Sequence, residues 1–369
     1  MSKNNRLLGI PVYIPSLDGN EKQYVNECLD SSWISSKGSF ISRFENEFGS
    51  YINVNGATTV SNGTVALHLA LLALGVGPGD EVIVPSLTYI ASVNAIGYVG
   101  ATPIFVDSLP DTWNVDPLDI AEKITSKTKA VMVVHLYGNP CAMEQIYAIC
   151  QKNKIKIIED AAEAFGSLYK GKYAGTFGDI ATFSFFGNKT ITTGEGGMVA
   201  SNDRSLVHRV AYLKSQSVSI EKEYWHEEIG FNYRMTNIAA AIGVAQLENA
   251  DKVLTKKRLI ADWYRSGLIG LPLKFQVEES VAVNSYWMVT VMAEDEFSRD
   301  IIRAYLKLHG VETRPVFYPA HTMPAFKQEK TYPVAESLSR RGINLPSYPQ
   351  LNEQDVANIC KLIKNSLDQ

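Results

Sequence analysis

From about residue 57 onward, short apolar runs alternate with stretches of helical pattern. Residues 65–74 are apolar and alanine-rich, and the Ser-Asn-Gly-Thr sequence before them supplies capping side chains, which predicts a helix. A Gly-Pro-Gly-Asp turn at 77–80 then leads into a predicted strand at 81–85. The same alternation predicts a helix at 92–97 and strands at 103–106, 130–135, 155–159 and 181–185. This order favours an α/β fold, with a mostly parallel central sheet and helices on both faces.

The pattern changes near residue 250. Residues 247–264 predict one long, charged amphipathic helix, and a strand at 285–292 and helices at 297–309 and 353–366 follow. We therefore expect a large α/β domain over 1–250 and a smaller C-terminal α+β domain over 251–369. The N-terminal segment, roughly residues 1–30, is expected to pack on the small domain.

Composition excludes several classes of protein. The 369 residues are 46% hydrophobic and 20% charged, which is typical of a globular protein with a large core. The 35 basic and 39 acidic side chains give a net charge of −4, so a basic surface for nucleic acid is not expected.

Three features of the sequence indicate in which cellular compartment the protein is found: the cysteines, the N-terminus and the apolar runs. Cys28, Cys141, Cys150 and Cys360 form no C-x-x-C pair, which argues against a zinc site or disulfide framework and favours a reducing cytoplasm. The N-terminus lacks the apolar core of a signal peptide, and no apolar run approaches a bilayer span. A cytoplasmic protein without a membrane partner is predicted.

Three chemically different side chains follow predicted strands. Tyr89 comes shortly after the strand at 81–85, Asp160 directly follows the strand ending at 159, and Lys189 lies just beyond the strand at 181–185. Because parallel strands present their carboxyl ends at one edge of a sheet, these side chains should lie close together. The sequence therefore predicts a site that combines an aromatic ring, a carboxylate and an amine.

These residue types suit an aldehyde cofactor that carries amino groups. Such a cofactor needs a lysine for a Schiff base, a carboxylate for its pyridinium nitrogen, an aromatic face, and a helix N-terminus for its phosphate. Lys189, Asp160, Tyr89 and the helix start at 61–64 are the candidates. Each also has an ordinary interpretation, respectively a solvated lysine, a helix-capping aspartate, a packed tyrosine and an N-cap.

Other kinds of site are not supported. Residues 187–190 end like a phosphate-binding P-loop, but Phe183 stands where that motif requires glycine. The six histidines show no metal-ligand spacing, so no metal is expected. We find no G-x-S-x-G nucleophile elbow.

Seven motifs, in order along the chain, resemble the sugar aminotransferases of the DegT/DnrJ/EryC1/StrS family, which have the fold-type I aminotransferase architecture. They are Ser-Asn-Gly-Thr at 61–64, Pro-Ser-Leu-Thr-Tyr at 85–89, His-Leu-Tyr-Gly at 135–138, Glu-Asp-Ala-Ala-Glu-Ala at 159–164, the segment 184–197 around Lys189, Gly-Phe-Asn-Tyr-Arg-Met at 230–235, and Arg-Pro-Val-Phe-Tyr-Pro at 314–319.

The resemblance implies pyridoxal 5′-phosphate as cofactor and a role for each matching residue. Lys189 would hold the cofactor and shuttle protons, and Asp160 would pair with the pyridinium nitrogen. The other implied cofactor contacts are Glu163 near the ring hydroxyl, Gly63, Thr64 and Ser184 at the phosphate, and Tyr89 against the ring. Asn232 would reach the phosphate across a homodimer interface, and Arg314, Tyr318 and His321 would lie on the substrate side.

The substrate is implied by a narrower resemblance. Residues 32–38, residues 183–197 and Glu163 look like the subgroup that transfers the amine of L-glutamate to C4 of GDP-4-keto-6-deoxy-D-mannose, giving GDP-perosamine. A UDP- or dTDP-linked keto sugar, aminated at C4 or C3, is the main alternative.

Two further alternatives are a 3-dehydratase, whose family members carry histidine in place of the Schiff-base lysine, and a non-catalytic binding or regulatory protein on the same scaffold. Lys189 argues against the dehydratase, and Lys189 with Asp160 argues against the non-catalytic protein. One departure from related chains is Ser217, where a glycine is usual.

Overall fold

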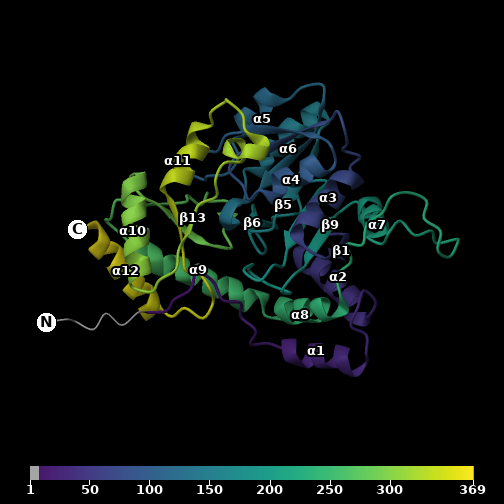
Figure 1. Cartoon of the computed structure of the whole chain (residues 1–369), viewed down its shortest axis with the longest axis horizontal. Coiled ribbons are helices and arrows are strands. Elements are labelled where there is room, and N and C mark those ends of the chain that lie inside the picture. The colour runs from purple at the N-terminus through teal and green to yellow at the C-terminus, as the bar shows by residue number, and fades with distance from the viewer. Residues whose placement is uncertain (1–7, 369) are drawn as a thin grey trace.

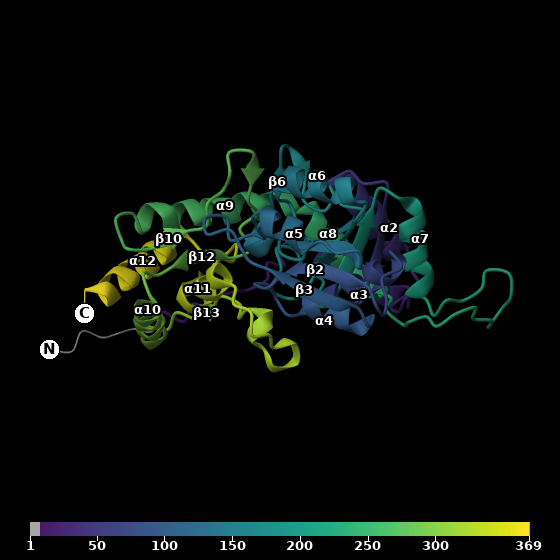
Figure 2. The same ribbon diagram turned by 90° about the horizontal axis from the view of Figure 1, so that it is seen from above.

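A seven-stranded sheet forms the centre of the protein, in a computed structural model that describes residues 8–368 (Figures 1 and 2). Its strand order is β1-β9-β8-β5-β4-β2-β3. The strands are β1 (Gly56–Val60), β2 (Glu81–Pro85), β3 (Thr102–Val106), β4 (Thr128–Val134), β5 (Lys156–Asp160), β8 (Ile180–Ser184) and β9 (Gly197–Ser201). In this order, the five adjacent strands β8, β5, β4, β2 and β3 are parallel to one another, and β9 runs antiparallel to its neighbours β8 and β1. The predicted mostly parallel sheet is confirmed, although β1 and β9 were not predicted.

Helices cover both faces of this sheet, because successive strand residues point to opposite sides and both sets are apolar. Strand β4 illustrates the pattern, since Met132 packs in one core cluster while Val131 and Val133 pack in another. The surrounding helices are α2 (Ser39–Ile52), α3 (Gly63–Ala73), α4 (Ala91–Tyr98), α5 (Pro117–Lys123), α6 (Met143–Asn153), α7 (Arg204–Leu213) and α8 (Asn237–Glu248). A long loop between α7 and α8 projects from this body (Figure 1).

The C-terminal part has its own sheet and core. Four strands in the order β10-β12-β14-β13 form an antiparallel sheet, whose core includes residues from three long helices. The elements are α9 (Ala250–Gly267), β10 (Lys274–Phe275), β12 (Val289–Met292), α10 (Glu296–Leu308), β13 (Arg314–Pro315), α11 (Pro333–Arg341), β14 (Gly342–Leu345) and α12 (Glu353–Leu367). A third, small sheet has the order β11-β6-β7. It pairs β11 (Ala282–Val283) of the C-terminal part with β6 (Leu168–Tyr169) and β7 (Lys172–Tyr173), which lie between β5 and β8 in the chain.

Two predicted elements differ from the structure. The single helix expected at 247–264 is two helices, because Asn249 leaves helical geometry (φ −101°, ψ 4°) between α8 and α9. The strand expected at 285–292 begins only at Val289. Before it, the backbone N–H of Ser285 donates to the Ser167 hydroxyl and that of Tyr286 to the Asn284 side chain, instead of to a neighbouring strand.

The N-terminal segment makes two kinds of contact. Ile10 pairs with Val311 and packs in the C-terminal core, whereas helix α1 (Glu21–Asp30) lies against α8. The Tyr24 hydroxyl of α1 donates to Glu248 at 2.7 Å. Between residues 8 and 368, no helix is both long and apolar enough to cross a membrane.

Candidate active site

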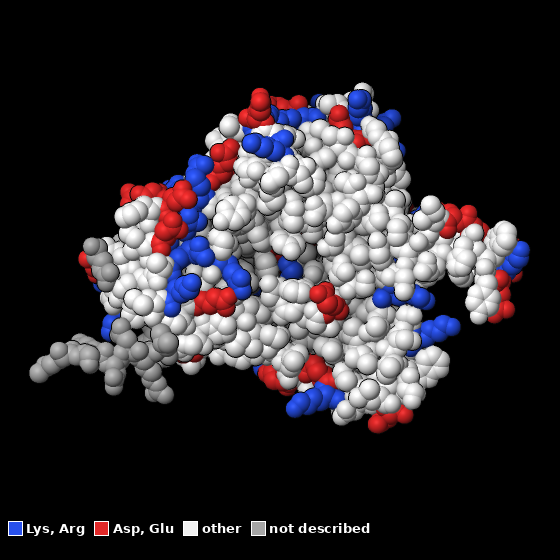
Figure 3. Space-filling view, viewed as in Figure 1, with Lys and Arg blue, Asp and Glu red and all other residues white. Residues whose placement is uncertain are grey.

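Lys189 lies in a tight turn just beyond β8. Its backbone N–H donates to the Phe186 carbonyl at 2.9 Å, and its Nζ lies 3.8 Å from the centroid of the Trp287 ring. Burial lowers the pKa of the Lys189 amine, and the nearby carboxylates of Glu163 and Asp160 oppose that shift. The space-filling view shows a hollow near the middle of one face with a basic side chain at its floor (Figure 3).

Asp160 is the last residue of β5, at the carboxyl edge of the sheet. Its carboxylate accepts hydrogen bonds from the Ser92 hydroxyl of α4 at 2.7 Å and from the Ala162 N–H at 3.1 Å. Burial raises the pKa of Asp160, while both hydrogen bonds and the charge of Lys189 oppose this rise. Ser92, which was not predicted as a site residue, therefore orients this carboxylate.

Glu163 is buried in the turn after β5. Its carboxylate accepts the backbone N–H of Tyr137 at 2.7 Å. Burial raises the pKa of Glu163 to about 7, although the charge of Lys189 acts in the opposite direction. Lys189, Asp160 and Glu163 thus interact electrostatically as one group. The strand-end position predicted that Lys189 and Asp160 lie close together, whereas Glu163 was expected near them only from the family resemblance.

The start of α3 forms a candidate anion site. Asn62 caps the helix by accepting the Val65 N–H at 3.0 Å, which leaves the amides of Gly63 and Thr64 without an acceptor among residues 8–368. Such free N–H groups and the helix dipole attract an anion. Ser184, at the end of β8, lies so close that a Cβ on Gly63 would come within 2.8 Å of the Ser184 Cβ. Glycine at position 63 therefore allows the start of α3 to approach the end of β8 this closely.

Aromatic rings line the region beside Lys189. Tyr89 is 57% exposed, and its ring packs at 5.7 Å and 53° against Phe317. Tyr137 stacks on Trp287 (6.0 Å, 14°) and on Phe317 (5.3 Å, 24°). Neither Tyr137 nor Trp287 was predicted as a site residue.

The remaining predicted residues lie in different settings. Asn232 is exposed at the base of the projecting loop and accepts from Arg234 at 3.1 Å. Arg314 is exposed and pairs with Glu312 at 2.6 Å. Tyr318 is also exposed. His321 is only 3% exposed, and its ring nitrogens face the Ser86 hydroxyl at 2.6 Å and the Glu336 carboxylate at 3.3 Å, so it supports its segment.

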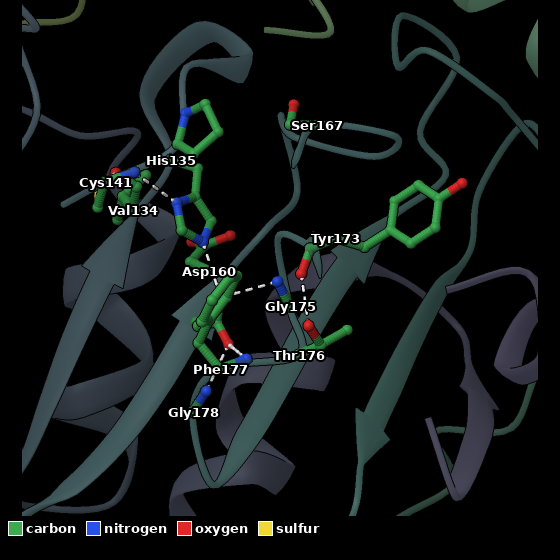
Figure 4. Close-up of polar contacts among 12 residues, drawn as sticks. Val134, His135, Cys141, Asp160, Ser167, Tyr173, Gly175, Thr176, Phe177 and Gly178 are labelled. Atoms are coloured by element: carbon green, nitrogen blue, oxygen red, sulfur yellow. Dashed lines mark hydrogen bonds and ion pairs between the residues drawn. The ribbon is translucent and has the colours of Figure 1, made fainter. Parts of the chain in front are cut away.

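Glu159, the residue before Asp160 in β5, forms a buried pair with His135, which Figure 4 shows close to Asp160. His135 Nδ1 accepts the Cys141 N–H at 3.0 Å, so the proton of the neutral ring is on Nε2, which faces the Glu159 carboxylate at 3.0 Å. Glu159 also accepts three backbone N–H groups, from Gly175, Phe177 and Gly178, at 2.6 to 2.7 Å. This dense set of bonds fixes β5 one residue before Asp160.

Comparison with known proteins identifies the family. The family model described as the DegT/DnrJ/EryC1/StrS aminotransferase family matches residues 15–364. The chain belongs to this family. It is 59% identical to a GDP-perosamine synthase of Escherichia coli O157:H7 over 96% of the chain and 97% of that protein, and 52% identical to one of Vibrio cholerae over 96% and 98%.

Solved structures agree with this assignment. The aminotransferase TlmJ from Streptoalloteichus hindustanus superposes with a TM-score of 0.93 at 32% identity, covering 97% of this chain and 99% of TlmJ. Spr1654 of Streptococcus pneumoniae, assigned as a sugar aminotransferase and solved in its PLP form, gives 0.93 at 29% identity, covering 98% and 99%. The predicted fold-type I architecture is confirmed.

The protein is therefore a pyridoxal-phosphate-dependent sugar aminotransferase. Its own residues fit that cofactor. The lysine lies over an aromatic face, a buried carboxylate ends the adjacent parallel strand, and glycine at position 63 lets the start of α3, with its free N–H groups, lie directly against Ser184. Within the described part of the chain, no group of three or more His, Cys, Asp or Glu side chains is placed to hold a metal ion.

Proposed function

We propose that the protein transfers the amino group of L-glutamate to C4 of GDP-4-keto-6-deoxy-D-mannose, forming GDP-perosamine and 2-oxoglutarate. The supporting observation is the 59% identity to the E. coli GDP-perosamine synthase over nearly the whole chain. Identity falls to 36% for an Aneurinibacillus thermoaerophilus transaminase named for a dTDP-linked 3-amino sugar.

Bound pyridoxal phosphate supplies an aldehyde carbon that takes up the amino group and a ring that stores an electron pair. We assign the covalent attachment to Lys189 Nζ, which when free moves a proton to and from the reacting carbon. A general base must be neutral at working pH, and burial favours the neutral amine of Lys189.

The other residues bind and orient in this proposal. Asp160, held by Ser92, keeps the proton on the pyridine nitrogen, and Glu163 lies near the ring hydroxyl. Tyr89 faces the ring. Gly63, Thr64 and Ser184 hold the phosphate at the start of α3, and Arg314, Tyr318 and His321 belong to the substrate side.

We further propose a homodimer in which Asn232 completes the site of the partner subunit. The projecting loop supports this proposal, because Ile220, Tyr224 and Ile229 are each at least 85% exposed. Burying these apolar side chains against a partner subunit would be favourable. Mixing Lys189→Ala subunits with Asn232→Ala subunits tests the arrangement, since a mixed dimer would contain one intact site. Recovery of about a quarter of wild-type activity is expected for random pairing of subunits. Independent sites would give none.

We also propose that the chain divides into a cofactor-binding domain over 1–250 and a small domain over 251–369. We propose a cytoplasmic location, supported by four cysteines that are all buried and unpaired.

The decisive experiment supplies the protein with L-glutamate and one of three keto sugars, linked to GDP, dTDP or UDP, and detects amino sugars by mass. We expect product from GDP-4-keto-6-deoxy-D-mannose. Turnover of only a dTDP- or UDP-linked sugar would overturn the substrate assignment.

The lysine is tested separately. Borohydride should abolish the visible absorbance of the bound cofactor and leave it attached to the peptide that contains Lys189. Lys189→Ala should be colourless and inactive, whereas the exposed Lys172→Ala should behave as wild type. Turnover by Lys189→Ala would refute the assignment.

A further inference from the structure

Two side chains from outside the central sheet bond to the backbone around Lys189. The Tyr13 hydroxyl donates to the Lys189 carbonyl at 2.5 Å. The Trp287 indole N–H donates to the Asn188 carbonyl at 2.6 Å. These donors lie 176 and 99 residues away along the chain, so the turn that carries Lys189 is fixed by tertiary contacts on two consecutive peptide groups.

Trp287 also touches the reacting nitrogen. Its ring face lies 3.8 Å from Lys189 Nζ, and the indole is 5% exposed. A cation over a tryptophan face in such a setting is attracted by the ring's electrons. The indole is itself held on one side by stacking against Tyr137. One side chain therefore fixes both the backbone next to Lys189 and its amine.

Lys257 of α9 contacts both Trp287 and Tyr13. It is 1% exposed, and its Nζ donates to the Trp287 carbonyl at 3.2 Å and to the Ser347 carbonyl at 2.6 Å. The same nitrogen lies 5.2 Å from the centroid of the Tyr13 ring. Burial lowers the pKa of Lys257 to about 7. Lys257 has no carboxylate partner among residues 8–368. Burying a lysine in this way is costly, which points to a specific use of its position.

We propose that Tyr13, Trp287 and Lys257 form a clamp that positions Lys189, with the Trp287 face holding the amine whenever it is free of the cofactor. This inference rests on the proposed role of Lys189. Free rotation of the amine would misplace the proton-transfer atom, and small misplacements lower rates strongly. Tyr13 and Lys257 act through the backbone and are positioning residues, whereas Trp287 contacts Nζ directly.

Single substitutions in the holoenzyme test the clamp. Tyr13→Phe removes one oxygen and Trp287→Phe removes the indole N–H and shrinks the ring, so both should lower kcat by about tenfold with KM for glutamate nearly unchanged. Tyr51→Phe is the matched control, because it loses a similar hydroxyl bond, to Asp251 at 2.7 Å, away from Lys189. Wild-type kcat in both clamp variants would overturn the proposal.

A second measurement does not depend on turnover. Full-length, cofactor-free protein is treated briefly with acetic anhydride, and acetylation of Lys189 is measured by peptide mass relative to the exposed Lys172. Trp287→Phe should acetylate Lys189 several-fold faster than wild type, since the smaller ring covers the amine less and the bond that holds the adjacent backbone at Asn188 is lost. Equal rates would overturn the clamp even if wild type aminates its sugar.

The two hypotheses can fail separately. If wild type forms no amino sugar and shows no cofactor absorbance, the proposed function fails, while the acetylation rates still decide whether the clamp holds Lys189. Lys257→Met tests the third member through the same acetylation, with its urea transition compared with wild type. A folded Lys257→Met protein with wild-type acetylation would remove Lys257 from the clamp.

Discussion

Glu163→Gln should change how stability depends on pH. Glu163 is buried, and its pKa is raised from 4.5 to about 7. Between these two values the folded protein keeps a proton that the unfolded chain releases. The free energy of unfolding therefore falls as pH rises from about 4.5 through about 7. Glutamine is neutral throughout, and its amide oxygen can still accept the Tyr137 N–H.

The size of the effect follows from the shift. Each pKa unit corresponds to about 1.4 kcal/mol, so the full difference is about 3 kcal/mol. Most of this, about 2 to 3 kcal/mol, should be lost between pH 5 and pH 8, because the unfolded glutamate has already released most of its proton at pH 5. Relative to Glu163→Gln, the wild type should become less stable by that amount across this range.

Urea unfolding of the full-length, cofactor-free proteins, followed by tryptophan fluorescence at equal concentrations, measures this difference. Glu122→Gln, at an exposed position, serves as the reference for losing a carboxyl group. A difference between wild type and Glu163→Gln that stayed constant, or that grew in favour of wild type with rising pH, would refute the reasoning. The second outcome would mean that Lys189 keeps Glu163 ionised.

Three further substitutions follow from single contacts. Ser217 has φ +50° and a buried hydroxyl without a partner among the described residues, so Ser217→Gly should raise the unfolding free energy by about 1 kcal/mol; a lower urea midpoint would contradict this. Ser92→Ala removes a donor to Asp160 and should reduce kcat about tenfold at saturating substrates, and an unchanged kcat would show that the bond is dispensable. Glu159→Gln places an NH2 group opposite backbone N–H donors, so the unfolding free energy should fall by about 3 kcal/mol or the protein should fail to fold. Thermal melting measures this loss, and an unaltered melting curve would show that Glu159 does not stabilise β5.

Local patterns in the sequence predicted the strands well because each strand of the parallel sheet is an apolar run bounded by a turn. Because parallel strands end at the same edge of a sheet, Lys189 and Asp160 were predicted to lie close together, and in the structure their charges interact. The break at Asn249 escaped detection, since the amphipathic pattern continues across it and no glycine or proline marks it.

The residues around Lys189 were harder to predict because their role depends on long-range contacts. Trp287 sits in an apolar run that reads as strand, yet its indole N–H reaches Asn188. Tyr13 lies between prolines at 11 and 15, in a segment with no periodic signal at all. Ser92 looks like an ordinary helix residue until α4 is placed against the end of β5.

Helix α9 belongs to two hydrophobic cores at once. Leu254 packs with the cluster of Phe44 and Phe183 beneath the large sheet, while Ile260 and Tyr264 pack in the C-terminal core. Helix formation is cooperative, so one half of α9 is not expected to unravel while the other stays folded. The two ends of the molecule should therefore denature in a single transition. Amide hydrogens in the middle of α9 should accordingly be among the last to exchange with solvent.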